Sequence, residues 1–116
     1  MLGEGKNMWG ICFDISLCEG TLFQHIIEYR MIDQSSAIII QPVSDVGIDI
    51  QMIRPIDTPP MYQYGDSVSP VNHTDMKAKI RAIVWHFKNN AFNYYIKTEN
   101  RKISRRYYEE DLIKID

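Results

Sequence analysis

Short runs of alternating apolar and polar residues, separated by turn-forming residues, constrain the fold of this chain more than any other feature. Ile27, Tyr29 and Met31 alternate with Glu28 and Arg30, as side chains do on a strand with one buried face. No segment shows the long 3.6-residue apolar period of an amphipathic helix. The sequence therefore predicts a mostly β protein with minimal helix.

The first half of the chain is predicted to form an antiparallel sheet or a barrel-like unit. Residues 8–15 are expected to be one strand. Residues 27–31 form a predicted hairpin with residues 37–40, whose unbroken apolar run indicates burial on both faces. After turn-forming residues at 44–47, the alternation over residues 48–52 predicts a further strand.

The second half changes its apolar phase within one strand. In residues 79–87 the apolar positions are even up to Ala82 and odd from Ile83 onward. A β-bulge produces such a one-residue change, and small barrels need bends of this kind to close. Asn89-Asn90 follows and predicts a tight hairpin, because asparagine tolerates positive φ.

The chain is expected to close through four short elements. Residues 92–97 and 103–107 are predicted strands. Residues 108–111 are expected to form a single helical turn, and residues 112–115 a short final strand. This order is typical of a small, strongly bent β-barrel.

Two consecutive prolines mark the best domain boundary. They fix φ and remove two amide donors, so strands are expected to stop at Thr58-Pro59-Pro60. We expect an N-terminal β unit over residues 1–57 and a small β-barrel over residues 61–116. Sheets of this size are marginal alone, so the two are expected to pack as one globule.

Four segments of the second half carry a family resemblance. They are Tyr64-Gly65-Asp66-Ser67-Val68, Ile80 with Ile83-Val84-Trp85-His86, Tyr94-Tyr95-Ile96 and Ser104-Arg105-Arg106-Tyr107-Tyr108 with Asp111-Leu112-Ile113. Their rhythm resembles that of SH3-like small barrels of the Tudor or KOW kind. The resemblance implies a binding module, since rim aromatic residues in those families bind methylated side chains, proline-rich peptides or nucleic acid.

The charge is divided unequally along the chain. The net charge is −2, but residues 1–59 contain three basic and eight acidic residues, whereas residues 60–116 contain ten basic and seven acidic residues. The halves therefore carry −5 and +3. Because surface potential steers association, each half favours a partner surface of opposite sign.

The overall composition suggests one kind of partner. A small, acidic, β-rich chain with much isoleucine, asparagine, lysine and tyrosine resembles bacterial immunity proteins of contact-dependent inhibition and other polymorphic toxin systems. That resemblance implies a cytoplasmic protein that neutralises a cognate toxin domain, possibly a nuclease, whose basic face an acidic surface would occupy. The candidate residues are Glu28, Asp33, Asp45 and Asp49.

The alternative is nucleic-acid binding by a basic and aromatic hairpin. Phosphate binding and base stacking need cations and aromatic rings on one surface. The opposing observations are the acidic balance of the whole chain and the acidic residues 109–111, which are placed to pair with the arginines and leave a solvated or protein-binding hairpin. The candidate residues are Tyr95, Lys97, Arg101, Lys102, Arg105 and Arg106, with Tyr95 and Lys97 expected to point outward.

No group of residues indicates catalysis or metal binding. His25, His73 and His86 are scattered, and none pairs recognisably with an acid and a nucleophile. Cys12 and Cys18 lack the spacing of a zinc site, so buried free thiols are expected. We therefore expect a protein that is not an enzyme and needs no cofactor. The absence of a long apolar run or leader-like segment favours a cytosolic location.

Overall fold

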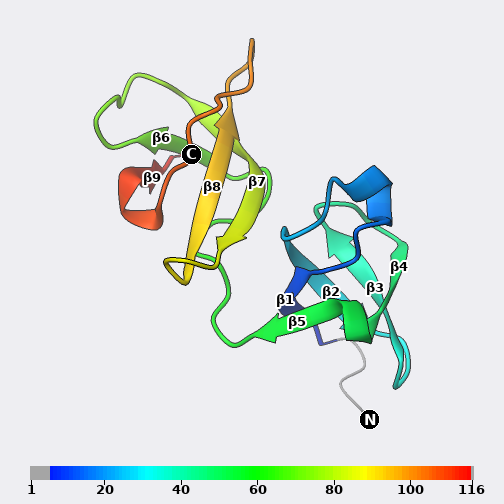
Figure 1. Ribbon diagram of the computed structural model, residues 1–116. Coiled ribbons are helices and arrows are strands. Elements are labelled where there is room, and N and C mark those ends of the chain that lie inside the picture. Colours follow the sequence, from blue (N-terminus) through cyan, green and yellow to red (C-terminus); the bar gives the residue numbers. More distant parts are fainter. Residues whose placement is uncertain (1–5, 116) are drawn as a thin grey trace. The chain divides into compact units, whose positions relative to one another are not determined.

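Antiparallel strands make up most of the regular structure of the computed structural model, which describes residues 6–115 (Figure 1). The prediction of a mostly β protein is confirmed. Contacts between Cα atoms divide the chain into unit 1, Met1–Pro59, and unit 2, Pro60–Asp116. None of the helices within residues 6–115 has the length and apolar character needed to cross a membrane.

Unit 1 is a five-stranded antiparallel sheet with the strand order β4-β3-β2-β1-β5. The first four strands follow one another as a meander, and the last strand returns to pair with the first. In chain order the elements are β1 (Met8–Cys12), η1 (Leu17–Gly20), β2 (Ile26–Met31), β3 (Ser36–Gln41), β4 (Val46–Asp49), η2 (Ile50–Met52) and β5 (Ile53–Ile56).

Apolar residues that share one face of this sheet form the core of unit 1. Ile27, Tyr29 and Ile39 are almost completely buried, in agreement with the alternation along β2. Ile38 and Ile40 are only half-buried, so the expectation of burial on both faces of β3 is wrong. The strand β3 has one core face because unit 1 consists of a single sheet.

The predicted strand over residues 48–52 is present only at residues 48–49, and residues 50–52 form a 3₁₀ turn instead. The strand β4 ends at Asp49, whose carboxylate accepts a hydrogen bond from the Gln51 amide at 2.9 Å and caps the 3₁₀ turn η2. The chain then enters β5, which the sequence analysis missed. Pro55 lies within β5 and is tolerated there because β5 is an edge strand.

Unit 2 has a related topology with one strand fewer. Four strands form a sheet in the order β8-β7-β6-β9, and β9 pairs with β6 as β5 pairs with β1 in unit 1. A single 3₁₀ turn precedes the closing strand, as predicted for residues 108–115. The elements are β6 (Ser67–Pro70), β7 (Ala78–His86), β8 (Ala91–Lys97), η3 (Glu109–Asp111) and β9 (Leu112–Lys114).

A β-bulge bends the longest hairpin of unit 2. The register of β7 against β8 shifts between Ile80 and Ala82, where the apolar phase changes in the sequence. The hairpin turn contains Asn90 with φ of 49°, as its sequence predicts. The bulge leaves Ile80 and Ile83 both buried, which explains how residues of different parity share one core.

The predicted fourth strand at residues 103–107 is replaced by two separate points of pairing with β8. Ile103 donates its amide to the Ile96 carbonyl at 3.0 Å, and Tyr107 exchanges two backbone hydrogen bonds with Tyr94. Tyr107 lies four positions after Ile103, whereas their partners Tyr94 and Ile96 on β8 are two positions apart. A continuous ladder of hydrogen bonds therefore cannot form. Residues 104–106 are exposed between the two points.

A buried hydroxyl joins the first residues of unit 2 to its far end. The Tyr94 hydroxyl donates to the Glu109 carboxylate at 2.9 Å and accepts from the Met61 amide at 3.0 Å. The Met61 amide also lies 3.2 Å from the same carboxylate oxygen. Burial, reinforced by Glu109, raises the pKa of Tyr94 well above its ordinary value and keeps its hydroxyl a donor. Tyr62 adds a hydrogen bond from its own hydroxyl to the Leu112 carbonyl at 2.8 Å.

Replacing the shared acceptor should weaken unit 2. We expect Glu109→Ala to lower its free energy of unfolding by about 1–3 kcal/mol, because the Tyr94 hydroxyl and the Met61 amide lose a charged acceptor. Urea unfolding followed by Trp85 fluorescence, in a Trp9→Phe background, measures the change.

The matched control is Glu110→Ala, which removes the same charge from an exposed neighbouring side chain. It should change the stability by less than about 0.5 kcal/mol. Equal losses for the two variants would contradict a specific role for the Glu109 carboxylate.

Candidate functional site

The four acidic residues predicted as a binding patch lie at two opposite ends of the unit 1 sheet. Asp33 bonds to Ser36, which pairs with Asp49, so these two acids share one end. Glu28 pairs with Gln41 near the other end of β3, close to the turn that contains Asp45. A strand of this length separates its ends by about 17 Å. The structure therefore brings the acids together as two pairs.

Three of these four carboxylates already have partners within unit 1. Asp33 accepts hydrogen bonds from the amides and hydroxyls of Ser35 and Ser36, which hold the pKa of its carboxyl below the ordinary value. Glu28 accepts from Gln41 at 2.6 Å and from Asn7 at 3.0 Å.

Asp49 caps η2, so its carboxylate also has a structural role. Asp45 is exposed on a turn with φ of 64° and makes no side-chain hydrogen bond among the described residues. It is the acid whose carboxylate remains most available to a partner.

The histidines and cysteines do not form a chemical site. Within residues 6–115, no three histidine, cysteine or acidic side chains gather closely enough to hold a metal ion. His86 is half-buried at the end of β7 and accepts a hydrogen bond from the Asn89 amide at 3.3 Å, as expected for a strand histidine. Both thiols are free. Cys12 is buried, but Cys18 is exposed, so the expectation of burial is wrong for Cys18, which lies in the η1 turn.

Unit 2 places three lysines side by side on β7, β8 and the segment after β8 that pairs with it. Lys79 of β7 is directly opposite Lys97 of β8, and Lys97 pairs in turn with Lys102. We call Lys79, Lys97 and Lys102 the lysine row. All three side chains are exposed, and none of the ion pairs found among residues 6–115 includes them. Directly opposed like charges are destabilising, so the row concentrates uncompensated positive charge.

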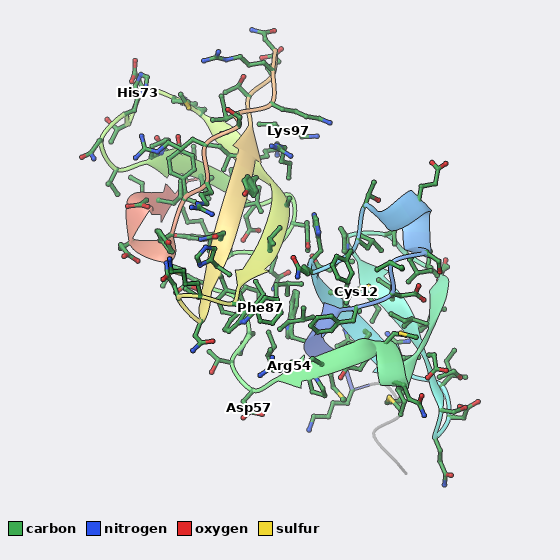
Figure 2. All side chains as sticks on the ribbon, in the orientation of Figure 1. Cys12, Arg54, Asp57, His73, Phe87 and Lys97 are labelled. Carbon is green, nitrogen blue, oxygen red and sulfur yellow. The ribbon has the colours of Figure 1, made fainter. Side chains whose placement is uncertain are left out.

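An open groove of about 550 Å³ adjoins the lysine row. Figure 2 labels Lys97 at the end of β8, where this groove begins. The volume is within the range of pockets that bind small ligands. The lining residues are Ser67, Lys77, Ala78, Lys79, Lys97, Thr98, Glu99 and Ile115.

A cation and an aromatic ring continue this surface along β8. The Arg81 guanidinium lies over the Tyr95 ring, 5.3 Å from its centre. It is held there by hydrogen bonds to the carbonyls of Ile96, at 3.3 Å, and Ile103, at 3.1 Å. Tyr95 and Lys97 are two positions apart on the strand, so this stacked pair and the lysine row share the outward side of β8.

The remaining arginines of the predicted hairpin occupy other positions. Arg101 lies in the turn after β8, close to the lysine row, where its carbonyl accepts from the Thr98 amide at 2.8 Å. Arg105 lies over the Tyr107 ring at 5.2 Å and beside a smaller hollow of about 200 Å³. Figure 2 labels His73, which lines the same hollow. Arg106 is exposed between the two points where this segment pairs with β8.

The acidic residues of η3 do not neutralise these arginines, contrary to one interpretation of the sequence. Glu109 binds Tyr94 and Met61, and Asp111 accepts from the Tyr108 amide at 2.9 Å. Neither acid takes part in an ion pair found among residues 6–115. The basic surface of unit 2 therefore keeps its charge.

Sequence reasoning missed three members of this surface. Basic residues occupy every second position around the start of β7. Lys77 lies just before β7, and Lys79 and Arg81 lie in its first half. Such spacing indicates one solvent-facing side of a strand. This spacing is visible in the sequence. That Lys79 lies opposite Lys97 depends on the register between β7 and β8, which the sequence does not show.

The repulsion within the lysine row gives a stability prediction. We expect Lys97→Glu to raise the free energy of unfolding of unit 2 by about 0.5–1 kcal/mol, because the new carboxylate faces Lys79 and Lys102. Lys88→Glu in the exposed β7–β8 turn is the control for the change in net charge. Urea unfolding at low salt measures both variants, and equal shifts would contradict repulsion within the row.

Comparison with known proteins gives one family. Residues 45–113 match the family described as "Family of unknown function (DUF6960)", a segment that runs from the β3–β4 turn into β9 and contains the lysine row. No curated protein and no solved structure matches the chain. Since the matched segment covers more than half of the sequence, the chain belongs to the DUF6960 family.

Proposed function

We propose that this protein is a binding module without enzymatic activity, and that unit 2 binds single-stranded nucleic acid through the lysine row. The observation that carries the proposal is the alignment of Lys79, Lys97 and Lys102 on three adjacent chain segments, with Lys79 and Lys97 lining an open groove. Lysines that retain their charge bind phosphates and release counterions. The resemblance of this half to SH3-like barrels is compatible with this use.

The stacked pair of Arg81 and Tyr95 favours a single strand over a duplex. Unpaired bases expose their faces and stack on aromatic rings and guanidinium planes. The guanidinium plane is fixed in advance by its two carbonyl partners, so little side-chain freedom is lost when a base stacks on it. A single strand could therefore place its phosphates at the lysine row and an unpaired base on the stacked pair.

Salt dependence tests this proposal. If the three lysines each neutralise one phosphate of a 12-nucleotide single strand, the logarithm of the binding constant should fall against the logarithm of salt concentration with a slope of about −2. Lys97→Ala should make this slope less steep by about 0.7. Fluorescence anisotropy of a labelled oligonucleotide measures both quantities.

Lys88→Ala is the matched control, because Lys88 lies in the β7–β8 turn at the opposite end of β8 from Lys97. Its slope should equal that of the wild type. The proposal fails if the wild type does not bind at low salt, or if Lys88→Ala changes the slope as much as Lys97→Ala does.

A second candidate is neutralisation of a basic partner, such as a toxin domain, by unit 1. The observation in its favour is that the charge asymmetry coincides with the division into units. Residues 1–59 carry −5 and residues 60–116 carry +3, and the units divide between Pro59 and Pro60. Asp45, with its exposed and unbonded carboxylate, is the residue best placed to contact such a partner.

A tagged pull-down from a bacterium that carries the gene tests this second candidate. A stoichiometric protein partner should survive nuclease treatment, and Asp45→Lys should reduce its recovery at unchanged melting temperature, because a repulsive charge replaces an attractive one. Asp57→Lys, in the exposed segment after β5, provides the control. Recovery of nucleic acid alone would exclude the toxin-neutralising role.

A further inference from the structure

The groove beside the lysine row contains one carboxylate. Glu99 lines it together with the side chains of Lys77, Lys79 and Lys97. Its backbone lies in a defined turn, because the Thr98 amide and hydroxyl both bond to the Arg101 carbonyl, at 2.8 Å and 3.3 Å. No ion pair found among residues 6–115 joins Glu99 to a lysine. A negative charge therefore remains in an otherwise basic groove.

The Glu99 carboxylate weakens the binding of a ligand that places only phosphate in the groove. Like charges repel, and the repulsion would reduce the benefit of the neighbouring lysines. An ionised carboxylate only accepts hydrogen bonds, so it favours a ligand with a donor beside its phosphate. The ribose 2′-hydroxyl is such a donor, and deoxyribose lacks it.

We propose that the groove binds a ribonucleotide unit of single-stranded RNA, with phosphate near Lys79 and Lys97 and a ribose hydroxyl donating to Glu99. This inference rests on the proposed function, because it names the class of nucleic acid that the same surface selects. Glu99 is a specificity residue in this scheme, and the lysines supply affinity. A groove of about 550 Å³ is large enough for a small ligand of this kind.

The affinities for a 12-nucleotide oligouridylate and its 2′-deoxy counterpart test the proposal. The wild type should bind the RNA about fivefold more tightly, the usual net effect of one hydrogen bond. Glu99→Ala should bind the two strands equally, because the acceptor is gone. Glu99→Gln keeps an acceptor oxygen and should retain part of the preference.

Glu110→Ala is the charge-matched control, since Glu110 is an exposed acid outside the groove. It should change both affinities by the same factor and leave their ratio intact. Melting temperatures confirm that each variant is folded, and Glu99 is exposed in a turn, so its replacement should leave the fold intact.

The outcomes separate this inference from the proposed function. Equal binding of RNA and DNA by the wild type would overturn the inference and leave nucleic-acid binding standing. Absence of binding to either strand would overturn both. An RNA preference that survives in Glu99→Ala would overturn the role assigned to Glu99.

Discussion

Pairing of the last strand of each unit with its first strand is the constraint on which the rest of the structure depends. A meander of short strands leaves its first strand with an open edge, and small sheets of this kind are marginally stable. In unit 1 the strand β5 covers β1, and in unit 2 the strand β9 covers β6. In both units a single 3₁₀ turn directly precedes this last strand and redirects the chain toward the first strand.

This closure also organises the candidate site. The strand β6 is held between β9 and β7, and the β7–β8 pairing then fixes Lys79 opposite Lys97. In the middle of β8, the buried Tyr94 hydroxyl connects the start of unit 2 to η3 through the Glu109 carboxylate. Buried residues on one side of β8 thus hold this strand in place, and Lys97 of the lysine row lies on its other side. Repulsion within the row is a cost that an anionic ligand would offset.

Both units close a meander with a returning strand, although unit 2 has one strand fewer and their sequences are not clearly similar. The units differ most in charge, so one topology presents an acidic surface and a basic one. Such a pair suits a protein that binds partners of opposite sign with its two units.

Elements with local sequence signals could be predicted without the structure. The phase change in β7, the Asn90 turn and the closing segment at residues 108–115 depend on neighbouring residues, and all are present. The strand β5 was missed because Pro55 argues against a strand unless its position at the sheet edge is known. The strand predicted at residues 103–107 is absent, because this segment has more residues between its two points of pairing than β8 has. Alternation of apolar and polar residues does not reveal such a difference in length.

The grouping of the charged residues depends on the folded sheets and could not be predicted from the sequence. The acids of unit 1 are close enough in sequence to suggest one patch, but the length of β3 separates them into two pairs. Lys79 is distant in sequence from Lys97 and Lys102, and strand pairing brings the three together. Alternation along a strand is encoded locally, since successive side chains point to opposite faces. Register across strands is set by the whole sheet, and it is this register that aligns the three lysines.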